Sequence, residues 1–228
     1  MTASQPNILL IMADQLMPFL TGAYGHPVVK TPNLDRLARE GVRFDAAYSS
    51  CPLCAPARAS LMTGRHVSNI RSYDNASAFD SEEPTIAHYL AAAGYDTAAS
   101  GKMHYIGPDQ LHGLHRRLTT DVYPEGYDWL DDRNLRHQPG YSFARAYTDE
   151  GISVGNWSHY LSYDEETHFR AKEYLRARGV AKQTALKRDQ TTQPFFLIAS
   201  YHHPHDPFWP PREFWDPYAC LLYTSPSP

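Results

Sequence analysis

The sequence has little cysteine and no long apolar run, and both absences restrict what the chain can be. Its only cysteines are Cys51, Cys54 and Cys220, too few for a disulfide framework, which agrees with a reducing compartment. The apolar run near the amino terminus, Ile8 to Ala13, stops at Asp14 and has no basic residues before it. Such a run is too short for a signal-peptide core or a membrane span. We therefore expect a cytoplasmic protein without a membrane partner.

The sequence also lacks a stripe of one charge. The formal net charge is -4, and acidic and basic residues alternate along the chain. Binding to a phosphate backbone needs clustered lysine and arginine, and no such cluster stands out. We expect no nucleic-acid partner.

What the chain does have is enough apolar material for a sizeable core. Its 228 residues are 42% hydrophobic, which suits one large domain or two small ones. The stretch "NILLIMA" is a continuous apolar run of strand length, a pattern typical of a strand buried on both faces. The stretch "TPNLDRLAREG" predicts a helix with Thr31 as N-cap, Pro32 in the first turn and Gly41 as its end.

Further strands and helices alternate along the chain. "CAPARASLMTG" predicts a second helix starting near Pro56, and "PTIAHYLAAAG" a third that ends at Gly94, whereas "YDTAASG" and "PFFLIASY" predict strands. Residues 131–160 show no clear period and are predicted as loop. The alternation indicates an α/β sandwich with a mostly parallel central sheet.

Polar residues follow each predicted strand. Asp14 and Gln15 follow the first, Lys102 and His104 follow "YDTAASG", and the cluster 202–206 follows "PFFLIASY". Ligands of such sheets gather at the carboxyl ends of the strands, so we expect these residues to share a site.

A helix beginning just after Cys54 would direct its free backbone N–H groups and positive dipole end toward whatever Cys54 holds. Arg58 lies one helical turn further on and can reach the same place, and Lys102 adds a point charge. These features predict a site that favours an anion.

The cysteine spacing leaves other interpretations open. Cys51 and Cys54 match a CxxC redox pair or half of a zinc site, but no second pair follows, which counts against both. The stretch "YHHPHDP" taken alone also suggests zinc.

Several stretches together resemble the formylglycine-dependent sulfatase family. "CAPAR" at 54–58 matches the family's CxPxR core, and "GYDTAASGKMH" resembles its second signature. "PNILLIMADQ" and "TPNLDRLAREGVRF" are similar to the family's first strand and helix, in the family's order. "YDNA", "GPDQLHG", "RLTTDVYP" and "HPHDP" are most similar to the choline-sulfatase subgroup, and the resemblance extends over residues 6–217. It implies an alkaline-phosphatase-like α/β fold.

The resemblance also implies a chemistry. In sulfatases a dedicated formylglycine-generating enzyme oxidises the motif cysteine, here Cys54, to an aldehyde that hydrates to a diol. One hydroxyl, activated by a divalent cation, attacks sulfur, and loss of the proton from the other releases sulfate. The cation would be calcium, or else magnesium or manganese, and the substrate a small sulfate ester, most similar to choline-O-sulfate.

Roles carried over by resemblance fall on six positions. Asp14 and residue 54 resemble metal ligands, and Gln15 stands where many sulfatases have a second aspartate. The other catalytic residues implied are Arg58 (holding the formylglycine), Lys102 (binding a sulfate oxygen), His104 (contacting the diol) and His205 (binding sulfate or protonating the leaving oxygen).

Asn75 and Trp129 match substrate-contacting positions of the choline-sulfatases. An indole face attracts a quaternary ammonium by about 0.5 to 2 kcal/mol through the cation–π interaction. A lone tryptophan is also often a packing residue, so this alternative stays open for Trp129.

The sequence lacks two further features of the family. Sulfatases have an Asp-Asn pair and a second lysine downstream, but after His205 only Asp206 and Asp216 remain, neither before asparagine, and no lysine occurs. We expect residues 1–217 to be the amino-terminal portion of a catalytic domain and 218–228 to be a doubtful tail. The chain alone would then be inactive and poorly soluble, and the complete protein could form a homo-oligomer.

Two rival functions remain at this point. One is hydrolysis of phosphonate monoesters or phosphodiesters by the same superfamily, and the other is a non-catalytic fragment or CxxC thiol module.

Overall fold

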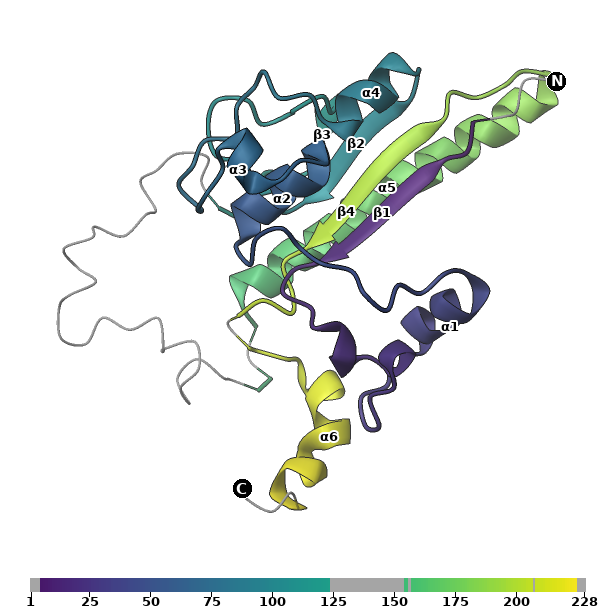
Figure 1. The fold of residues 1–228 in the computed structure, drawn as a ribbon. Helices are drawn as coiled ribbons and strands as arrows, with labels where there is room; N and C mark the ends of the chain where they lie inside the picture. Colours follow the sequence, from purple (N-terminus) through teal and green to yellow (C-terminus); the bar gives the residue numbers. More distant parts are fainter. Residues whose placement is uncertain (1–4, 124–153, 156, 207, 225–228) are drawn as a thin grey trace.

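The computed structural model describes residues 5–123, 154–155, 157–206 and 208–224. A four-stranded sheet lies at its centre, in the order β1-β4-β2-β3 (Figure 1). The strands are β1 (Ile8–Ala13), β2 (Asp96–Gly101), β3 (Arg116–Arg117) and β4 (Phe195–Tyr201). All three pairings are parallel, which confirms the predicted parallel sheet.

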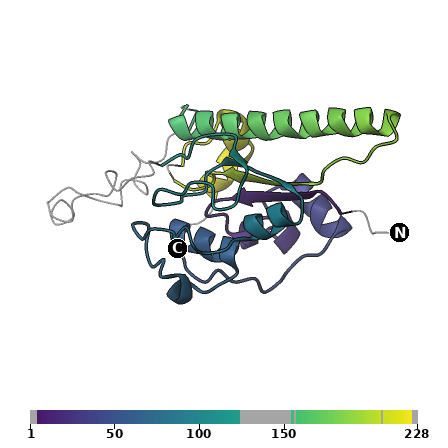
Figure 2. The ribbon, with the colours of Figure 1, turned by 90° about the horizontal axis from the view of Figure 1, so that it is seen from above.

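Helices lie on both faces of this sheet. The described helices are α1 (Pro32–Glu40), α2 (Cys54–Thr63), α3 (Val67–Ile70), α4 (Ile86–Ala92), α5 (His159–Lys187) and α6 (Arg212–Thr224), with 3-10 turns at Pro18–Leu20 and Gly22–Tyr24. Figure 2 shows α5 on one side of the sheet and α2 and α4 on the other. The result is the three-layer arrangement expected of an α/β sandwich.

Local sequence explains the ends of the predicted helices. Pro32 stands in the first turn of α1, and Gly41 follows its last residue. Thr31 occupies the N-cap position without capping, because its hydroxyl donates to Asp35 and accepts from the N–H of Gly22. The helix predicted near Pro56 starts two residues earlier, at Cys54.

Two apolar clusters hold the layers together, one on each face of the sheet. The first joins α2, α3 and α4 to the sheet and includes Ala59, Met62, Ile70, Ala87, Ala99, Phe196 and Ile198. The second joins α5 to β2 and β4 and includes Ala98, Ala171, Tyr174, Phe195, Leu197 and Ala199. Strands β2 and β4 are therefore buried on both faces, as parallel central strands usually are.

Strand β1 corrects the prediction made from "NILLIMA". Ile8, Leu10 and Met12 pack against the first cluster, but Leu9 is 44% exposed and Ile11 is 60% exposed. The prediction of burial on both faces is wrong because, among the described residues, β1 pairs only with β4 and so lies at an edge of the sheet. An apolar run cannot tell an edge strand from a central one.

Two further segments differ from the sequence-based reading. The 29-residue helix α5 was not predicted, and its first two residues lie inside the segment 131–160 that was predicted as loop. Helix α6 contains Pro217 and continues past residue 218. The boundary expected between the catalytic-domain portion 1–217 and the tail 218–228 stays a prediction. Among the described helices, no segment combines the length and the apolar character needed to cross a membrane.

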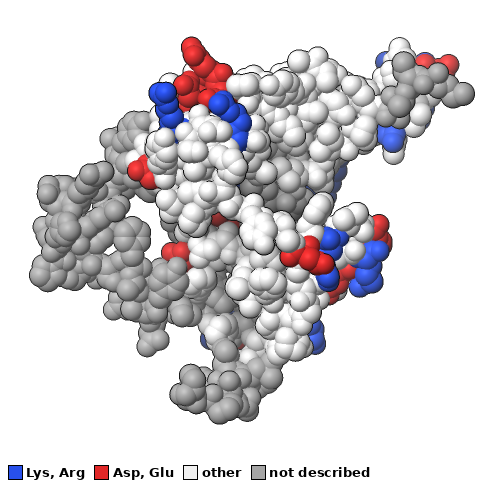
Figure 3. All heavy atoms as spheres, viewed as in Figure 1, with Lys and Arg blue, Asp and Glu red and all other residues white. Residues whose placement is uncertain are grey.

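Surface charges are mixed on the face drawn in Figure 3, where basic and acidic side chains lie in small neighbouring groups. Ion pairs between described residues include Arg36–Glu40, Arg43–Asp45 and Arg65–Glu83. This face shows no basic stripe of the kind that nucleic-acid binding needs.

Candidate active site

Residues that follow three parallel strands meet at one end of the sheet. Asp14 follows β1, Lys102 follows β2, and the segment 202–206 follows β4. The N–H of Asp14 donates to the carbonyl of Tyr201 at 3.2 Å, and that of Lys102 donates to the carbonyl of Ser200 at 2.9 Å. These backbone bonds continue the sheet pairing just beyond the strands and fix the spacing of the polar side chains.

Cys54 is the first residue of α2 and faces these strand ends. Its Sγ atom lies 3.7 Å from Nζ of Lys102. Burial, opposed by the Lys102 ammonium, leaves the pKa of the Cys54 thiol raised above its ordinary value. The thiol is therefore protonated at neutral pH, which is unlike the low-pKa cysteines that act as thiol nucleophiles.

Lys102 is the central cation of the site. Its side chain is 0% exposed, and its ammonium contacts the carboxylate of Asp14. The same ammonium lies 4.6 Å from the centre of the Tyr123 ring, a cation–π contact. A lysine is seldom fully buried unless it is paired, so Asp14 and Tyr123 explain how it is accommodated.

Arg58 lies behind Lys102, with 4% of its surface exposed. Its Nη1 donates to the backbone carbonyl of Lys102 and to Oγ of Ser200, the latter at 2.8 Å. Its Nη2 lies 3.5 Å from Oδ2 of Asp14. The guanidinium thus ties the ends of β2 and β4 to α2 and balances Asp14, and its expected contact with the group at position 54 stays a prediction.

Asp14 carries the negative charge that these two cations balance. Burial pushes the pKa of Asp14 upward, but Lys102 and Arg58 outweigh it, so the pKa is lowered. The carboxylate is therefore ionised at neutral pH.

The chemistry of the donor set fits one part of a divalent-cation site. Asp14, Cys54 and His205 each offer a ligand atom, and these atoms lie within 4.8 Å of one another. A carboxylate, together with an oxygen at position 54 after oxidation, suits a hard cation such as calcium. Calcium takes six to eight oxygen ligands, so the described residues would form only part of its shell.

His104 lies in a tight turn two residues after Lys102. Its φ of 55° is in the left-handed region, and its ring is tilted against Tyr123 at 4.6 Å. Burial and the nearby Lys102 ammonium lower the pKa of His104 to about 4. The imidazole is therefore neutral at neutral pH and can accept a proton.

His205 and His202 come from the segment after β4. Nδ1 of His205 lies 2.9 Å from the carbonyl oxygen of Asp206. The ring of His202 is stacked on Tyr160 at 4.2 Å and tilted against His205 at 4.7 Å. Burial and Lys102 lower the pKa of His202 to about 3, so this ring is neutral as well.

The amino terminus of α2 is less open than the sequence suggested. The N–H of Ala55 donates to Oδ1 of Asn75 at 3.0 Å, and the N–H of Ala57 donates to the carbonyl of Leu53 at 3.0 Å. Pro56 has no N–H, so α2 offers an anion few free donors. Asn75 lies beside Cys54, where its side-chain oxygen holds the start of α2, and its expected contact with the substrate stays a prediction.

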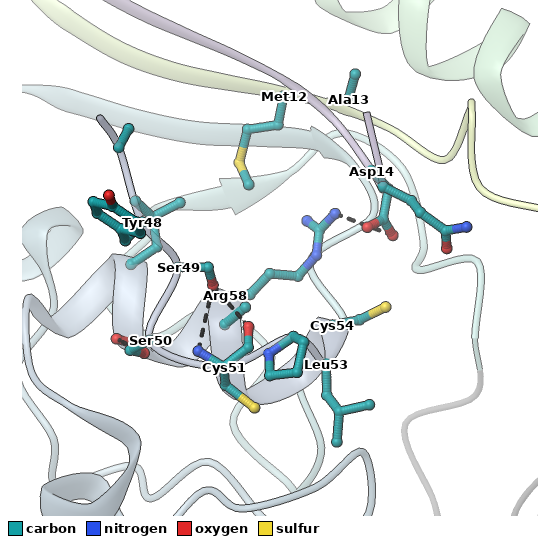
Figure 4. Close-up of a pocket in the computed structure, with 16 residues that line it drawn as sticks. Met12, Ala13, Asp14, Tyr48, Ser49, Ser50, Cys51, Leu53, Cys54 and Arg58 are labelled. Carbon is teal, nitrogen blue, oxygen red and sulfur yellow. Dashed lines mark hydrogen bonds and ion pairs between the residues drawn. The ribbon is translucent and has the colours of Figure 1, made fainter. Parts of the chain in front are cut away.

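A cavity of about 540 Å³ opens beside Asp14 and Cys54. It is lined by residues 12–15, 47–54, 57, 58, 60 and 61. Figure 4 shows Arg58 directed toward Asp14 at the inner end, with the Cys54 sulfur on the side of Asp14. Gln15 and Cys51 line the same cavity. Cys51 and Cys54 are both free thiols.

One predicted site residue cannot be placed, and several residues found at the site were not predicted. Trp129 lies outside the described residues, so its role stays a prediction. Sequence reasoning missed Tyr123, Asp121 and Asp164, which contact the candidate catalytic residues or the backbone of their segments, whereas His202 belongs to the cluster 202–206 that was expected at the site. Tyr123 and Asp121 belong to "RLTTDVYP", and that stretch was the one signal available for them.

Known proteins match this chain at the level of the family and the fold. Residues 6–220 match the Sulfatase family. Choline-sulfatase of Rhizobium meliloti (strain 1021) is 41% identical over 228 residues, which is 100% of this chain and 44% of that protein. Arylsulfatase A of Bos taurus is 36% identical over 226 residues, covering 93% of this chain and 44% of that protein.

A solved structure supports the same fold. The phosphonate monoester hydrolase of Agrobacterium radiobacter is similar with a TM-score of 0.60 and 29% identity, over 91% of this chain and 42% of that one. The chain thus spans less than half the length of these relatives. Its parallel sheet and its neighbours place it in the alkaline-phosphatase-like α/β class. The chain belongs to the sulfatase family.

Proposed function

We propose that the protein carrying this chain hydrolyses sulfate esters at the site centred on Cys54. The observation that carries the proposal is the position of Cys54 at the start of α2, with Lys102, Asp14 and His205 around it. The family match supports the reaction class. The raised pKa of the Cys54 thiol supports a role that requires conversion of the thiol rather than its direct use.

This chemistry also requires a modified residue and a metal ion. Formylglycine at position 54, made by a formylglycine-generating enzyme, supplies a hydroxyl nucleophile and a route for releasing sulfate. A divalent cation would be held by Asp14 and residue 54, and it would supply charge that favours the ionised hydroxyl.

The chain's own residues bind the anion and move protons. Lys102 brings positive charge to within 3.7 Å of the Cys54 sulfur, where the sulfo group of an ester would lie. A carbonyl oxygen only accepts, so Nδ1 of His205 carries the proton in its contact with Asp206, and Nε2 can take or return a proton at the site. His104, neutral because of its low pKa, is the second proton acceptor.

The substrate we propose is choline-O-sulfate or a similar small alkyl sulfate. The 41% identity to a choline-sulfatase over the whole chain supports this choice. Trp129 is proposed to bind the quaternary ammonium through its indole face, and Asn75 to lie close to the ester from beside Cys54.

The test compares substrates on the protein at its natural length. Sulfate release is measured from choline-O-sulfate and from an uncharged aryl sulfate, for the wild type and for Trp129→Ala. We expect Trp129→Ala to raise KM for choline-O-sulfate more than for the aryl sulfate, because only choline presents a cation. Equal changes would make Trp129 a packing residue, and absence of sulfate release from every ester would overturn the proposal.

Phosphonate monoester hydrolysis is the second candidate. The similarity to a phosphonate monoester hydrolase favours it, since that structure matches 91% of the chain. Including a phosphonate monoester in the same assay separates the two, because the faster reaction identifies the native substrate class.

A further inference from the structure

Asp121 receives two consecutive backbone N–H groups from the turn that carries the catalytic residues after β2. Its Oδ2 accepts from the N–H of Met103 and from the N–H of His104, both at 2.8 Å. Nη2 of Arg117 donates to the same oxygen at 3.1 Å. The Asp121 side chain is only 4% exposed, so water does not compete strongly for these bonds.

The same segment holds the other end of that turn. Nη2 of Arg117 also donates to the carbonyl of Gly101 at 2.8 Å, and the N–H of Gly101 donates to Oγ1 of Thr119 at 2.8 Å. Residues 117–121 therefore hold the backbone on both sides of Lys102. Its ammonium is held separately, by Asp14 and Tyr123.

Asp164, on α5, plays the equivalent part for the segment after β4. Its Oδ1 accepts from the N–H of His202 at 2.7 Å, and its Oδ2 accepts from the N–H of His203 at 2.9 Å. Nδ1 of His203 lies 2.7 Å from the same Oδ2. Each catalytic segment is therefore tied to a carboxylate from a distant part of the chain.

Asp109 also accepts from two backbone N–H groups, but both belong to its own turn. Its Oδ1 accepts from the N–H groups of Leu111 and His112, at 2.9 and 3.0 Å, within its own turn. Such a bond shapes a local loop. Asp121 and Asp164 differ because they accept from other segments, at residues 103–104 and 202–203.

The turn at His104 needs such support. Its φ of 55° is uncommon for a residue other than glycine, and such a conformation persists when surrounding contacts hold it. The two bonds to Asp121 arrive at this residue and the one before it.

We infer that Asp121 and Asp164 are positioning residues, which fix Lys102 and His104, and His205, through the backbone of their two segments. The inference rests on the proposed function, in which those three side chains act on the ester. Neither carboxylate contacts the substrate in this account. A displacement of about 1 Å in a catalytic group can cost about 100-fold in rate, so loss of either one should lower kcat.

The test uses the natural-length protein with Asp121→Ala, Asp121→Asn, Asp164→Ala and the matched control Asp109→Ala. We expect kcat for sulfate-ester hydrolysis to fall about 100-fold in Asp121→Ala and in Asp164→Ala, with a smaller change in KM. Asp121→Asn keeps an acceptor oxygen and should recover part of the loss. Asp109→Ala should retain kcat within about threefold, because its turn carries no catalytic residue.

A second measurement does not depend on activity. Amide hydrogen exchange in Asp121→Ala should speed up at Met103 and His104 while Ala98 and Ala99, in the middle of β2, keep their protection. Equal kcat losses in Asp109→Ala and Asp121→Ala, or unchanged exchange at Met103 and His104, would overturn the inference. If the wild type releases no sulfate, the proposed function fails, and the exchange experiment still decides whether Asp121 holds the turn.

Discussion

The residues around β2 and β4 differ sharply from those between Asp14 and Leu53. In the first region both strands are buried on each face, and polar contacts hold the segments that follow them. In the second region α1 has no buried residue, and Val42 and Phe44 are 79% and 69% exposed. Contacts within the described residues therefore fix the positions of Lys102, His104 and His205. The cavity wall formed by residues 47–53 is held by far fewer of these contacts.

The two cysteines test this difference most strongly: both are half-buried, but Cys51 lies in the second region, whereas Cys54 begins α2, which packs against the sheet. In the natural-length protein, Cys54→Ala should abolish sulfate release because it removes the group that becomes the nucleophile. Cys51→Ala should leave most of the activity. The measurement is the rate of sulfate release from choline-O-sulfate, and equal losses in both variants would favour the dithiol interpretation.

Core truncation should distinguish the regions by stability. Leu197 in β4 is fully buried, so Leu197→Ala should lower the free energy of unfolding by about 2–5 kcal/mol. Ile11→Ala, at a position 60% exposed, should lower the free energy of unfolding by much less than Leu197→Ala does. Urea unfolding of the chain measures both, and a similar cost at the two sites would show that β1 is buried in solution.

A pH dependence should come from Asp96, in the buried region. Burial pushes its pKa upward, but Arg116 and Tyr174 outweigh burial and the pKa is lowered. A lowered pKa contributes stability above the unfolded value of 3.8, and this is lost as the pH falls through the folded value. Asp96→Asn should therefore cost about 1–3 kcal/mol at neutral pH and progressively less below pH 3.8.

The control for this pH effect is Asp45→Asn, at a carboxylate that is 74% exposed and pairs with Arg43. Urea unfolding of both variants at neutral and at acid pH makes the comparison. A loss in Asp96→Asn that stays constant across this range would contradict the electrostatic explanation.

The smallest effect is expected in the exposed region. Phe44→Ser should change the free energy of unfolding by about 0.5 kcal/mol or less, because a largely solvated side chain loses few contacts. Thermal unfolding of the chain provides the measurement. A loss of several kcal/mol would place Phe44 in a core that the described contacts do not contain.

Local sequence signals predicted much of this fold. The stretches "NILLIMA", "YDTAASG" and "PFFLIASY" predicted β1, β2 and β4, and proline with glycine marked the ends of α1. Helix α5 was not predicted because charged and polar residues interrupt its apolar positions, and its buried residues Thr167, Ala171 and Tyr174 form only a narrow stripe. The edge position of β1 depends on pairing across the chain, which no local pattern records.

The candidate site was predictable only where a motif marked it. Residues after the strands were expected to meet, and the structure brings Asp14, Lys102 and His205 together at one end of the sheet. The contacts of Asp121 and Asp164 join positions 17 to 39 residues apart, so no spacing rule points to them. The use of Arg58 as a buried brace likewise depends on Ser200, which is 142 residues away.

The central claim is that position 54 acts as formylglycine rather than as a thiol. Mass spectrometry of the tryptic peptide Phe44–Arg58 from active, natural-length protein tests it directly, with fragment ions separating Cys51 from Cys54. The account predicts a peptide lighter by the difference between cysteine and formylglycine, with the change at 54. An unmodified Cys54 in protein that releases sulfate at full rate would contradict it.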